Sequence, residues 1–163
     1  MEIHRAPGPP RTNIVISGGR RIAVLEVSGT RDRGAVHHAD RTRWSLQRPP
    51  GATEWWIVDD AGEPLGTLAR TNLVRERFTL EIAGTNVTLV PVSKPWQRRW
   101  SVVDAADREL IEVVQRPLSR TVHDLLLRSG DVPAELPLAV AWTVALATSV
   151  RVGEVRGARW SLR

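Results

Sequence analysis

The sequence predicts a mainly β fold: an antiparallel closed barrel or roll, built from repeated hairpins, with a C-terminal hydrophobic helix in its core. Three observations predict it. Short apolar runs alternate with turns that contain Gly or Asp, two hairpin-like segments align with each other, and a long uncharged stretch follows the second of them. Evenly spaced short strands are typical of meanders that close on themselves.

The chain begins with a proline-rich segment, residues 1–12, which we expect to form a flexible lead-in. Apolar runs at 14–16 and 22–27 surround a Gly-Gly turn, and this pattern predicts a first hairpin. Residues 28–53 have the composition of a loop, apart from a short strand at 44–46.

The strongest signal is an internal repeat. Residues 55–68 (WWIVDDAGEPLGTL) align without gaps on residues 100–113 (WSVVDAADRELIEV), and the hairpin at 14–27 is a degenerate third copy. Asp59 and Asp104 fall at the same place, where an Asp side chain can bond nearby backbone amides. We therefore assign these carboxylates to turns rather than to acid–base chemistry.

A further hairpin lies between the two copies. Residues 78–82 and 87–92 alternate apolar and polar side chains, and residues 83–86 turn the chain. Such alternation predicts strands with one buried face and one wet face.

The uncharged stretch, residues 136–150, predicts a helix over about 133–150 that begins at Asp131 or Glu135. Fifteen helical residues span about 22 Å, which is shorter than the roughly 30 Å hydrocarbon layer of a membrane. A helix that is apolar all round must be enclosed, so we favour a core helix. A tail anchor and an oligomer contact are the alternatives.

A single barrel domain is expected over 13–150, followed by a basic tail over 151–163. Charge is uneven: residues 1–52 hold nine Arg against four acidic residues, whereas residues 53–150 hold ten basic and thirteen acidic residues. Nearly all the basic residues are Arg, a preference that codon usage in a GC-rich bacterial genome also explains. Arg offers bidentate contacts to phosphate that Lys does not.

The aromatic residues are seven Trp and one Phe, so Trp must supply most of the ring packing. We expect one of Trp55 and Trp56, together with Trp100 and Trp142, to be core. The other three lie beside basic residues, where Arg can stack on indole or the ring can face a partner: Trp44, Trp96 and Trp160.

A strand–acidic turn–strand hairpin repeated after 45 residues, followed by an apolar helix, resembles the tubby C-terminal-like superfamily, which includes phospholipid scramblases and LURP-one-related proteins. The residues that carry the resemblance are Trp55 to Arg70, Trp100 to Arg116, and Asp124 to Val150. It implies a closed twelve-stranded barrel around a central helix and a leaning toward anionic lipid surfaces. The chain departs from scramblases because it has no Cys and no Asp-x-Asp-x-Asp-Gly calcium loop.

No catalytic, cofactor or metal motif is legible, so we expect a non-enzymatic protein without a cofactor. The adjacent His37 and His38 suit neither a helical nor a strand metal site. We place His123 and Asp124 in a turn or cap. No apolar secretory signal is visible at the start of the sequence. We therefore expect the protein in the cytoplasm, either free or at the cytoplasmic surface of a membrane.

The function we predict is binding of anionic lipid headgroups. The candidate anion-binding residues are Arg20, Arg21, Arg41, Arg43, Lys94, Arg98 and Arg99. Nucleic-acid binding through the Arg-rich N-terminal region is the second hypothesis, with Arg31, Arg33, Arg41, Arg43 and Arg48 as its residues. A structural or protein-interaction domain is the third.

Overall fold

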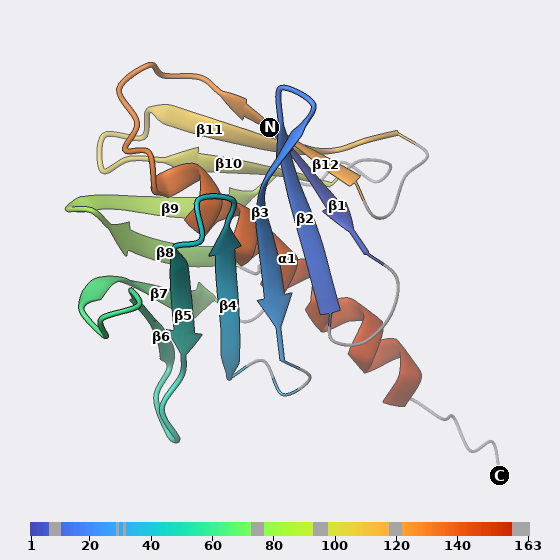
Figure 1. Ribbon diagram of the computed structural model, residues 1–163. Helices are drawn as coiled ribbons and strands as arrows, with labels where there is room; N and C mark the ends of the chain where they lie inside the picture. The colour runs from blue at the N-terminus through green and yellow to red at the C-terminus, as the bar shows by residue number, and fades with distance from the viewer. Residues whose placement is uncertain are drawn as a thin grey trace, which may run out of the picture.

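The computed structural model describes the backbone of residues 1–6, 11–28, 30, 32–72, 77–92, 98–117 and 122–157, and their side chains except those of Arg11, Asn72 and 149–157. Within these described residues, twelve strands and one helix follow one another (Figure 1). The strands are β1 (Glu2–Arg5), β2 (Arg11–Ser17), β3 (Arg20–Val27), β4 (Arg33–His38), β5 (Arg43–Gln47), β6 (Glu54–Val58), β7 (Pro64–Asn72), β8 (Arg77–Ile82), β9 (Thr85–Pro91), β10 (Arg99–Val103), β11 (Glu109–Gln115) and β12 (Val122–Leu127).

All twelve strands belong to one closed antiparallel barrel, in which each strand pairs with its neighbours in sequence and β1 closes the ring against β12. This confirms the predicted fold class. The flexible lead-in predicted for residues 1–12 is wrong for Glu2–Arg5, because β1 pairs with both β2 and β12. Its four residues bury a single apolar side chain, Ile3, too short a pattern to predict a strand.

The internal repeat is a structural repeat. Trp55 pairs with Leu68 in the β6–β7 hairpin, and Trp100 pairs with Val113 in the β10–β11 hairpin. Each register shifts once, directly after Ile57 in one hairpin and directly after Val102 in the other. Both hairpins therefore carry a β-bulge at the same place, 45 residues apart in the sequence.

The β2–β3 hairpin also contains a β-bulge, and its turn is shorter than those of the other two hairpins. Its register shifts between Val15 and Ile16, and its turn is made by Gly18 and Gly19, which have positive φ angles of 56° and 74°. Two successive positive φ angles match the right-handed twist of a two-residue hairpin turn. A bulged hairpin thus recurs at every fourth strand around the barrel, as β2–β3, β6–β7 and β10–β11.

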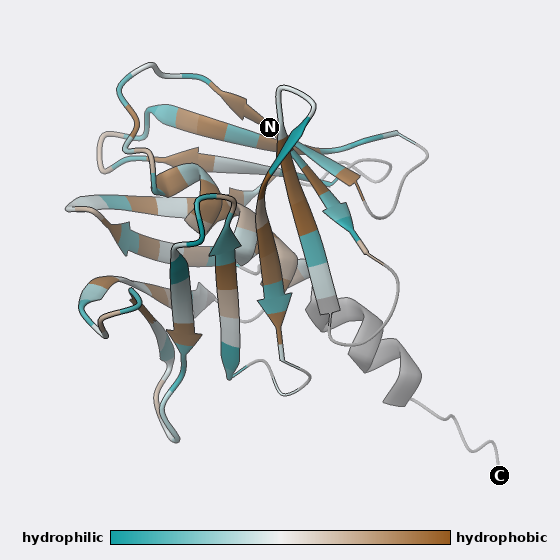
Figure 2. Cartoon of the chain, in the orientation of Figure 1, coloured by the Kyte–Doolittle hydropathy of each residue, from teal (hydrophilic) through white to brown (hydrophobic). Residues whose placement is uncertain are grey.

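The helix α1 (Leu136–Gly157) enters the barrel after β12 and runs through it (Figure 1). Every side chain from Leu136 to Ala147 is buried. The buried hydroxyl of Thr143 donates a hydrogen bond to the carbonyl of Ala139, with an Oγ1 to O distance of 2.8 Å. Pro137 lies in the first turn, where its missing N–H costs nothing. Hydrophobic residues alternate with polar ones along the strands (Figure 2), and the buried strand residues form one core cluster with this segment. The predicted core helix is confirmed.

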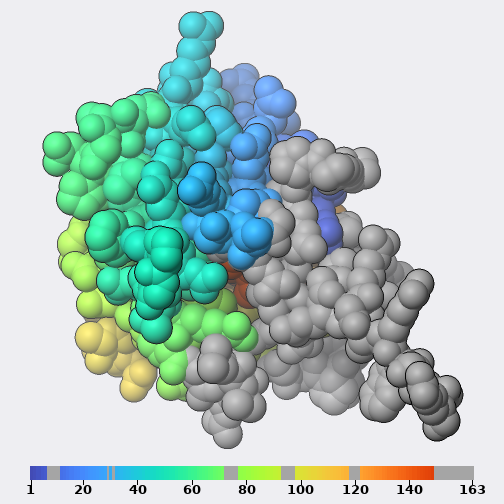
Figure 3. Space-filling model, turned by 90° about the horizontal axis from the view of Figure 1, so that it is seen from below, coloured from blue at the N-terminus to red at the C-terminus, as the bar shows by residue number. Residues whose placement is uncertain are grey.

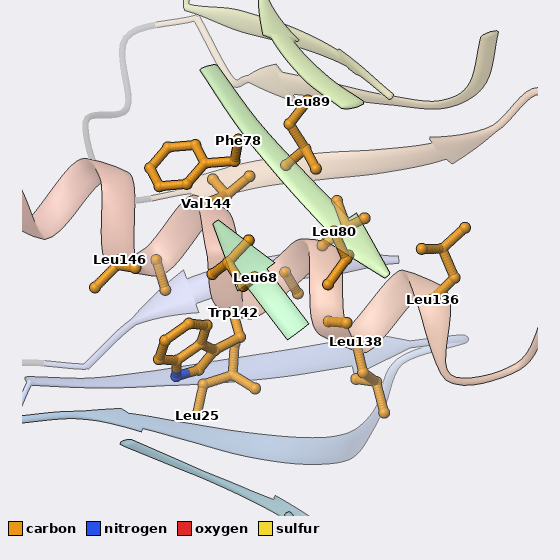
Figure 4. Packing of buried hydrophobic residues seen from close by; sticks show 14 of the residues in the cluster. Leu25, Leu68, Phe78, Leu80, Leu89, Leu136, Leu138, Trp142, Val144 and Leu146 are labelled. Carbon is orange, nitrogen blue, oxygen red and sulfur yellow. The ribbon is translucent and has the colours of Figure 1, made fainter. Parts of the chain in front are cut away.

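Trp142 is the largest side chain that α1 buries. It lies beside Leu25 of β3, while Val144 meets Phe78 of β8 on the other side of the helix (Figure 4). Gly34 of β4 makes room for it: a Cβ there would come within 2.8 Å of Trp142 Nε1 and 2.7 Å of the Glu26 carbonyl. That glycine is one reason why β4 has the composition of a loop.

Three boundaries differ from the predictions. The segment predicted as loop, 28–53, contains β4, and His123 and Asp124 lie in β12 rather than in a turn or cap. The helix begins at Leu136 and continues to Gly157, into the predicted tail of 151–163. Across the described residues, we find no helix with the length and apolarity needed to cross a membrane.

Candidate functional site

The antiparallel barrel has two ends with different connections. At the turn end lie the tight turns that follow the even-numbered strands, together with residues 128–135, which lead into α1. At the opposite end lie the last residues of the odd-numbered strands and the first residues of the even-numbered ones. We call this second end the basic rim, for the reason given below.

Four of the seven candidate anion-binding residues lie together at the turn end. Arg20 and Arg21 begin β3, and Arg41 and Arg43 lie in and directly after the turn that follows β4. The backbone N–H of Ala39 donates to the carbonyl of Ile22 at 2.9 Å, which places this turn beside the start of β3. All four side chains are exposed.

Acidic residues share the turn end with these arginines. The backbone N–H of Arg43 donates to Asp60 Oδ2 at 3.0 Å. Hydrogen bonds from the side chain and backbone of Thr42 lower the pKa of Asp40, so this carboxylate stays charged beside Arg41. For each end we count the last three residues of every strand that arrives there, the first two of every strand that leaves, and the described residues between them. By this count the turn end holds six Arg and eleven Asp or Glu. The four candidates therefore stand in a surface that is acidic on balance.

The remaining candidates divide differently. Arg98 and Arg99 lie at the start of β10, on the basic rim, and Lys94 lies outside the described residues. Arg99 Nε is 2.6 Å from Glu112 Oε1, and its Nη2 is 3.5 Å from Glu109 Oε1. The structure thus brings four of the candidates together at one end and places Arg98 and Arg99 at the other.

The basic rim carries an arginine ring that the sequence did not reveal. Counted in the same way as at the turn end, it holds three acidic residues, Glu26, Asp32 and Glu54, against nine arginines. The arginines are Arg5, Arg11, Arg33, Arg48, Arg70, Arg77, Arg98, Arg99 and Arg116. They come from eight different strands or the residues beside them, so no single stretch of sequence shows them as a cluster.

Strand alternation explains where several of these side chains lie. Arg5, Arg70 and Arg98 stand two residues from the buried Ile3, Leu68 and Trp100, respectively, on the same side of their strands. Successive residues of a strand alternate between its two faces. These arginines therefore continue the inner face of the barrel to its mouth, where the apolar lining ends. That spacing is the signal by which the sequence could have predicted the ring.

Some members of the ring are held by acidic partners. Arg116 Nη2 is 2.8 Å from Asp124 Oδ1 and also pairs with Glu2, and hydrogen bonds from His4 and Arg116 lower the pKa of Glu2. Arg48 lies over the ring of the buried Trp55, 4.9 Å from its centroid. These contacts account for Arg48, Arg99 and Arg116 by structure alone.

Other members have no such partner. Within the part of the chain that the structure describes, no acidic side chain pairs with Arg5, Arg33 or Arg77, and the last two are exposed. Unpaired arginines are available to an anionic partner. Figure 3 looks at this end of the barrel and shows a small part of α1 between the blue-to-cyan and green segments.

Among the described residues, one large apolar side chain is exposed at the basic rim: Val92, directly after β9, is 40% exposed. Trp56, the middle residue of β6, is 51% exposed, and Leu126 and Leu127, at the turn end, are 41% and 58% exposed. The sequence prediction left open whether Trp55 or Trp56 is core, and the structure buries Trp55. Trp44 is also buried, with its ring 4.6 Å from that of His38, so its predicted stacking on arginine is wrong. Trp96 and Trp160 lie outside the described residues.

The histidines do not form a metal centre. His37 Nε2 is 3.4 Å from Glu26 Oε2, whereas burial lowers the pKa of His38. Among the residues with described side chains, no three His, Asp or Glu are arranged to hold a metal ion. The predicted turn carboxylates do serve as turn residues: Asp104 Oδ1 accepts from the backbone N–H groups of Ala106 and Arg108 at 2.8 and 3.0 Å.

Comparison of the chain with protein-family models, with curated proteins and with solved structures finds no match. The closed twelve-stranded barrel around a helix, which the tubby-like resemblance implied, is present. Membership of that superfamily stays a prediction.

Proposed function

We propose that this protein is a non-enzymatic domain that binds anionic phospholipid surfaces through its basic rim. The observation that carries the proposal is the concentration of nine arginines at one end of the barrel, of which Arg5, Arg33 and Arg77 pair with no acidic side chain among the described residues. Each basic residue close to an acidic membrane contributes about 1 kcal/mol of binding free energy.

An exposed apolar side chain supports a membrane partner. Val92 lies at the same end as the arginines, and a surface that combines unpaired arginines with an exposed apolar side chain suits a lipid headgroup layer.

Nucleic-acid binding is supported less well. The arginines predicted for it are divided by the fold: Arg33 and Arg48 lie on the basic rim, Arg41 and Arg43 at the turn end, and Arg31 outside the described residues. A phosphate backbone would thus meet two of them at a time. We therefore treat nucleic-acid binding as an outcome of the test.

Co-sedimentation with vesicles tests the proposal. One variant replaces Arg5, Arg33 and Arg77 with Gln, and a matched control replaces Arg20, Arg21 and Arg43, so both lose three charges at opposite ends of the barrel. We expect wild type to bind phosphatidylcholine vesicles that contain phosphatidylserine, and not neutral ones, at low salt. The rim variant should lose roughly 100-fold in partition coefficient, from three contributions of about 1 kcal/mol.

The matched control should bind almost as well as wild type. If both triple variants lose binding equally, net charge rather than the basic rim is responsible. Equal binding to neutral and acidic vesicles would contradict the proposal. Tight binding of labelled oligonucleotides with no binding to acidic vesicles would establish the nucleic-acid function instead.

A further inference from the structure

A polar strip interrupts the apolar lining of the barrel directly inside the basic rim. It runs across neighbouring strands, from Arg98 beside β10 and Gln115 of β11 to His123 of β12; Asn13 of β2 lies beyond the intervening strand β1. Gln115 is the cross-strand partner of His123, and the backbone N–H of Gln115 donates to the carbonyl of Arg98 at 2.9 Å. His123 is 5% exposed and Asn13 is 8% exposed, so the strip faces inward.

Two buried nitrogens in this strip lack hydrogen-bond partners. Trp100 Nε1 and His123 Nε2 are both shielded from solvent with no partner in the described structure, and the two rings are 5.6 Å apart between centroids. A buried polar group left unpaired costs about 1–3 kcal/mol. A ligand with hydrogen-bond acceptors at this place would offer a partner to both.

The internal repeat makes the contrast sharper. Trp55 occupies in the β6–β7 hairpin the position that Trp100 occupies in the β10–β11 hairpin, and both rings are buried. Arg48 stacks on Trp55, whereas Trp100 faces the polar strip with its N–H unpaired. The unpaired indole N–H is therefore specific to Trp100 and is not a general property of the repeated hairpin.

The strip lies between the packed core and the basic rim. Among the strands, β2, β3 and β8 approach α1 most closely, and the buried side chains of β10, β11 and β12 belong to the same core cluster as the helix. Arg98, directly before β10, stands at the basic rim. The strip therefore borders the rim at the point where the apolar lining ends.

The donors of the strip indicate the class of ligand. An indole N–H and a guanidinium can only donate hydrogen bonds, and a histidine can donate from either ring nitrogen. A ligand with acceptors only and a negative charge matches this set, whereas a metal cation would be repelled by Arg98. Phosphate oxygens have this character.

We propose that Trp100, His123 and Arg98 bind the phosphate group of a lipid headgroup that enters the barrel from the basic rim. This inference rests on the proposed function and identifies where the headgroup is bound. Burial and Arg98 lower the pKa of His123, and a phosphate against its ring would work in the opposite direction.

The test observes the Trp100 indole N–H by nuclear magnetic resonance while a water-soluble, short-chain phosphatidylserine is added below its micelle concentration. A Trp100→Phe variant assigns the resonance. We expect a downfield shift of this signal and no shift of the Trp55 signal. Inorganic phosphate is added in a second arm: a shift there as well identifies a general phosphate site, and a shift with the lipid alone identifies a headgroup site.

Variants then measure the contribution of each group. Trp100→Phe and His123→Leu remove a nitrogen donor but keep an apolar ring or branched side chain, and each should weaken short-chain lipid binding at least tenfold. Trp55→Phe is the matched control, since it makes the same change at the repeated position and should leave affinity unchanged. Arg98→Gln, at the mouth of the barrel, tests the site without altering the core.

The failures of the two proposals are distinguishable. If acidic vesicles bind wild type through the basic rim but the Trp100 signal does not move, the inner site is refuted and the proposed function stands. If Trp55→Phe weakens lipid binding as much as Trp100→Phe, the loss is one of core packing and the inner site is likewise refuted. If vesicles do not bind while phosphate still moves the Trp100 signal, the proposed function fails and the site binds a free phosphate.

Discussion

Asp59 and Asp104 hold the same position in two hairpins that are 45 residues apart. Asp59 Oδ1 accepts hydrogen bonds from the backbone N–H groups of Ala61 and Glu63, both at 2.9 Å, and Asp104 makes the equivalent pair of bonds with Ala106 and Arg108. Each carboxylate thereby organises the turn whose length sets the register of its hairpin.

We expect Asp59→Ala and Asp104→Ala to lower the melting temperature by similar amounts, about 2–4 °C each for a chain of this size. The reason is that each substitution releases two backbone N–H groups of a turn. Thermal unfolding followed by circular dichroism measures both. Glu63→Ala, at an exposed side chain of the same turn, is the control, and a loss as large as that of Asp59→Ala would show that the pair of turn bonds is not the cause.

Trp142 provides the second prediction. It is 1% exposed on a helix that the barrel encloses, and its Nε1 donates to the carbonyl of Glu26 at 3.4 Å. Trp142→Ala should lower the free energy of unfolding by about 3–5 kcal/mol, because it opens a large cavity in the core. Urea denaturation measures the loss. Trp56→Ala, at an exposed ring, should change stability far less, and equal losses would place Trp142 outside the core.

A buried carboxylate between two arginines leads to the third prediction. Glu112 is 5% exposed; its Oε1 faces Arg99 and its Oε2 accepts from Arg128 Nε at 3.0 Å. Glu112→Gln should destabilise the protein by about 2 kcal/mol, between the values for exposed and buried pairs, because both arginines can turn to solvent.

The control for Glu112→Gln is Glu63→Gln, an exposed residue of the β6–β7 turn. Its effect should stay within about 0.5 kcal/mol. Equal urea midpoints for the two variants would show that the contacts of Glu112 contribute no net stability.

The hairpins could be predicted because their information is local. In the β6–β7 and β10–β11 hairpins the apolar positions alternate, the turn Asp is present, and the two copies support each other. The helix was equally legible, because a segment without charge must be enclosed. The residues that determine these elements are consecutive in the sequence, so local patterns are enough to predict them.

Strands β1, β4 and β12 depend on distant partners instead. Gly34 in β4 is explained by Trp142, which lies more than 100 residues later in the chain. His123 looks like a turn residue beside Asp124, yet its neighbours across β11 and β1 bury it. Composition cannot reveal such residues, because the reason for them lies elsewhere in the sequence.

The basic rim was hidden for a related reason. Of the seven candidate residues predicted from the sequence, the fold brings Arg20, Arg21, Arg41 and Arg43 together at the turn end, whereas Arg98 and Arg99 lie on the basic rim. The larger ring is assembled from the ends of alternating strands, so its members are spread from Arg5 to Arg116. Once the strand ends are known, the rule of two residues beyond the last buried side chain finds several of them.

His123 gives the last prediction. Burial, together with the positive charge of Arg98, lowers the pKa of His123 to about 4 from 6.5, and Asp124 opposes the shift. Between these two values the unfolded chain takes up a proton that the folded protein does not bind, so stability falls as the pH decreases through this range. The stability of the folded state that depends on neutral His123 is fully present above the unfolded-state pKa, and it is lost progressively as the pH falls below that value.

Urea denaturation should therefore show a loss of about 2 kcal/mol between pH 7 and pH 5, rising to about 3 kcal/mol near pH 4. The carboxylates whose pKa is lowered, such as Asp40 and Asp104, act below this window, because their stabilisation is lost only as the pH falls below about 4. His38 acts in the same direction as His123, since burial lowers its pKa as well. His123→Leu should therefore remove most of the slope between pH 7 and pH 5, and an unchanged slope in that variant would assign the effect to His38 and show that His123 is protonated in the folded barrel.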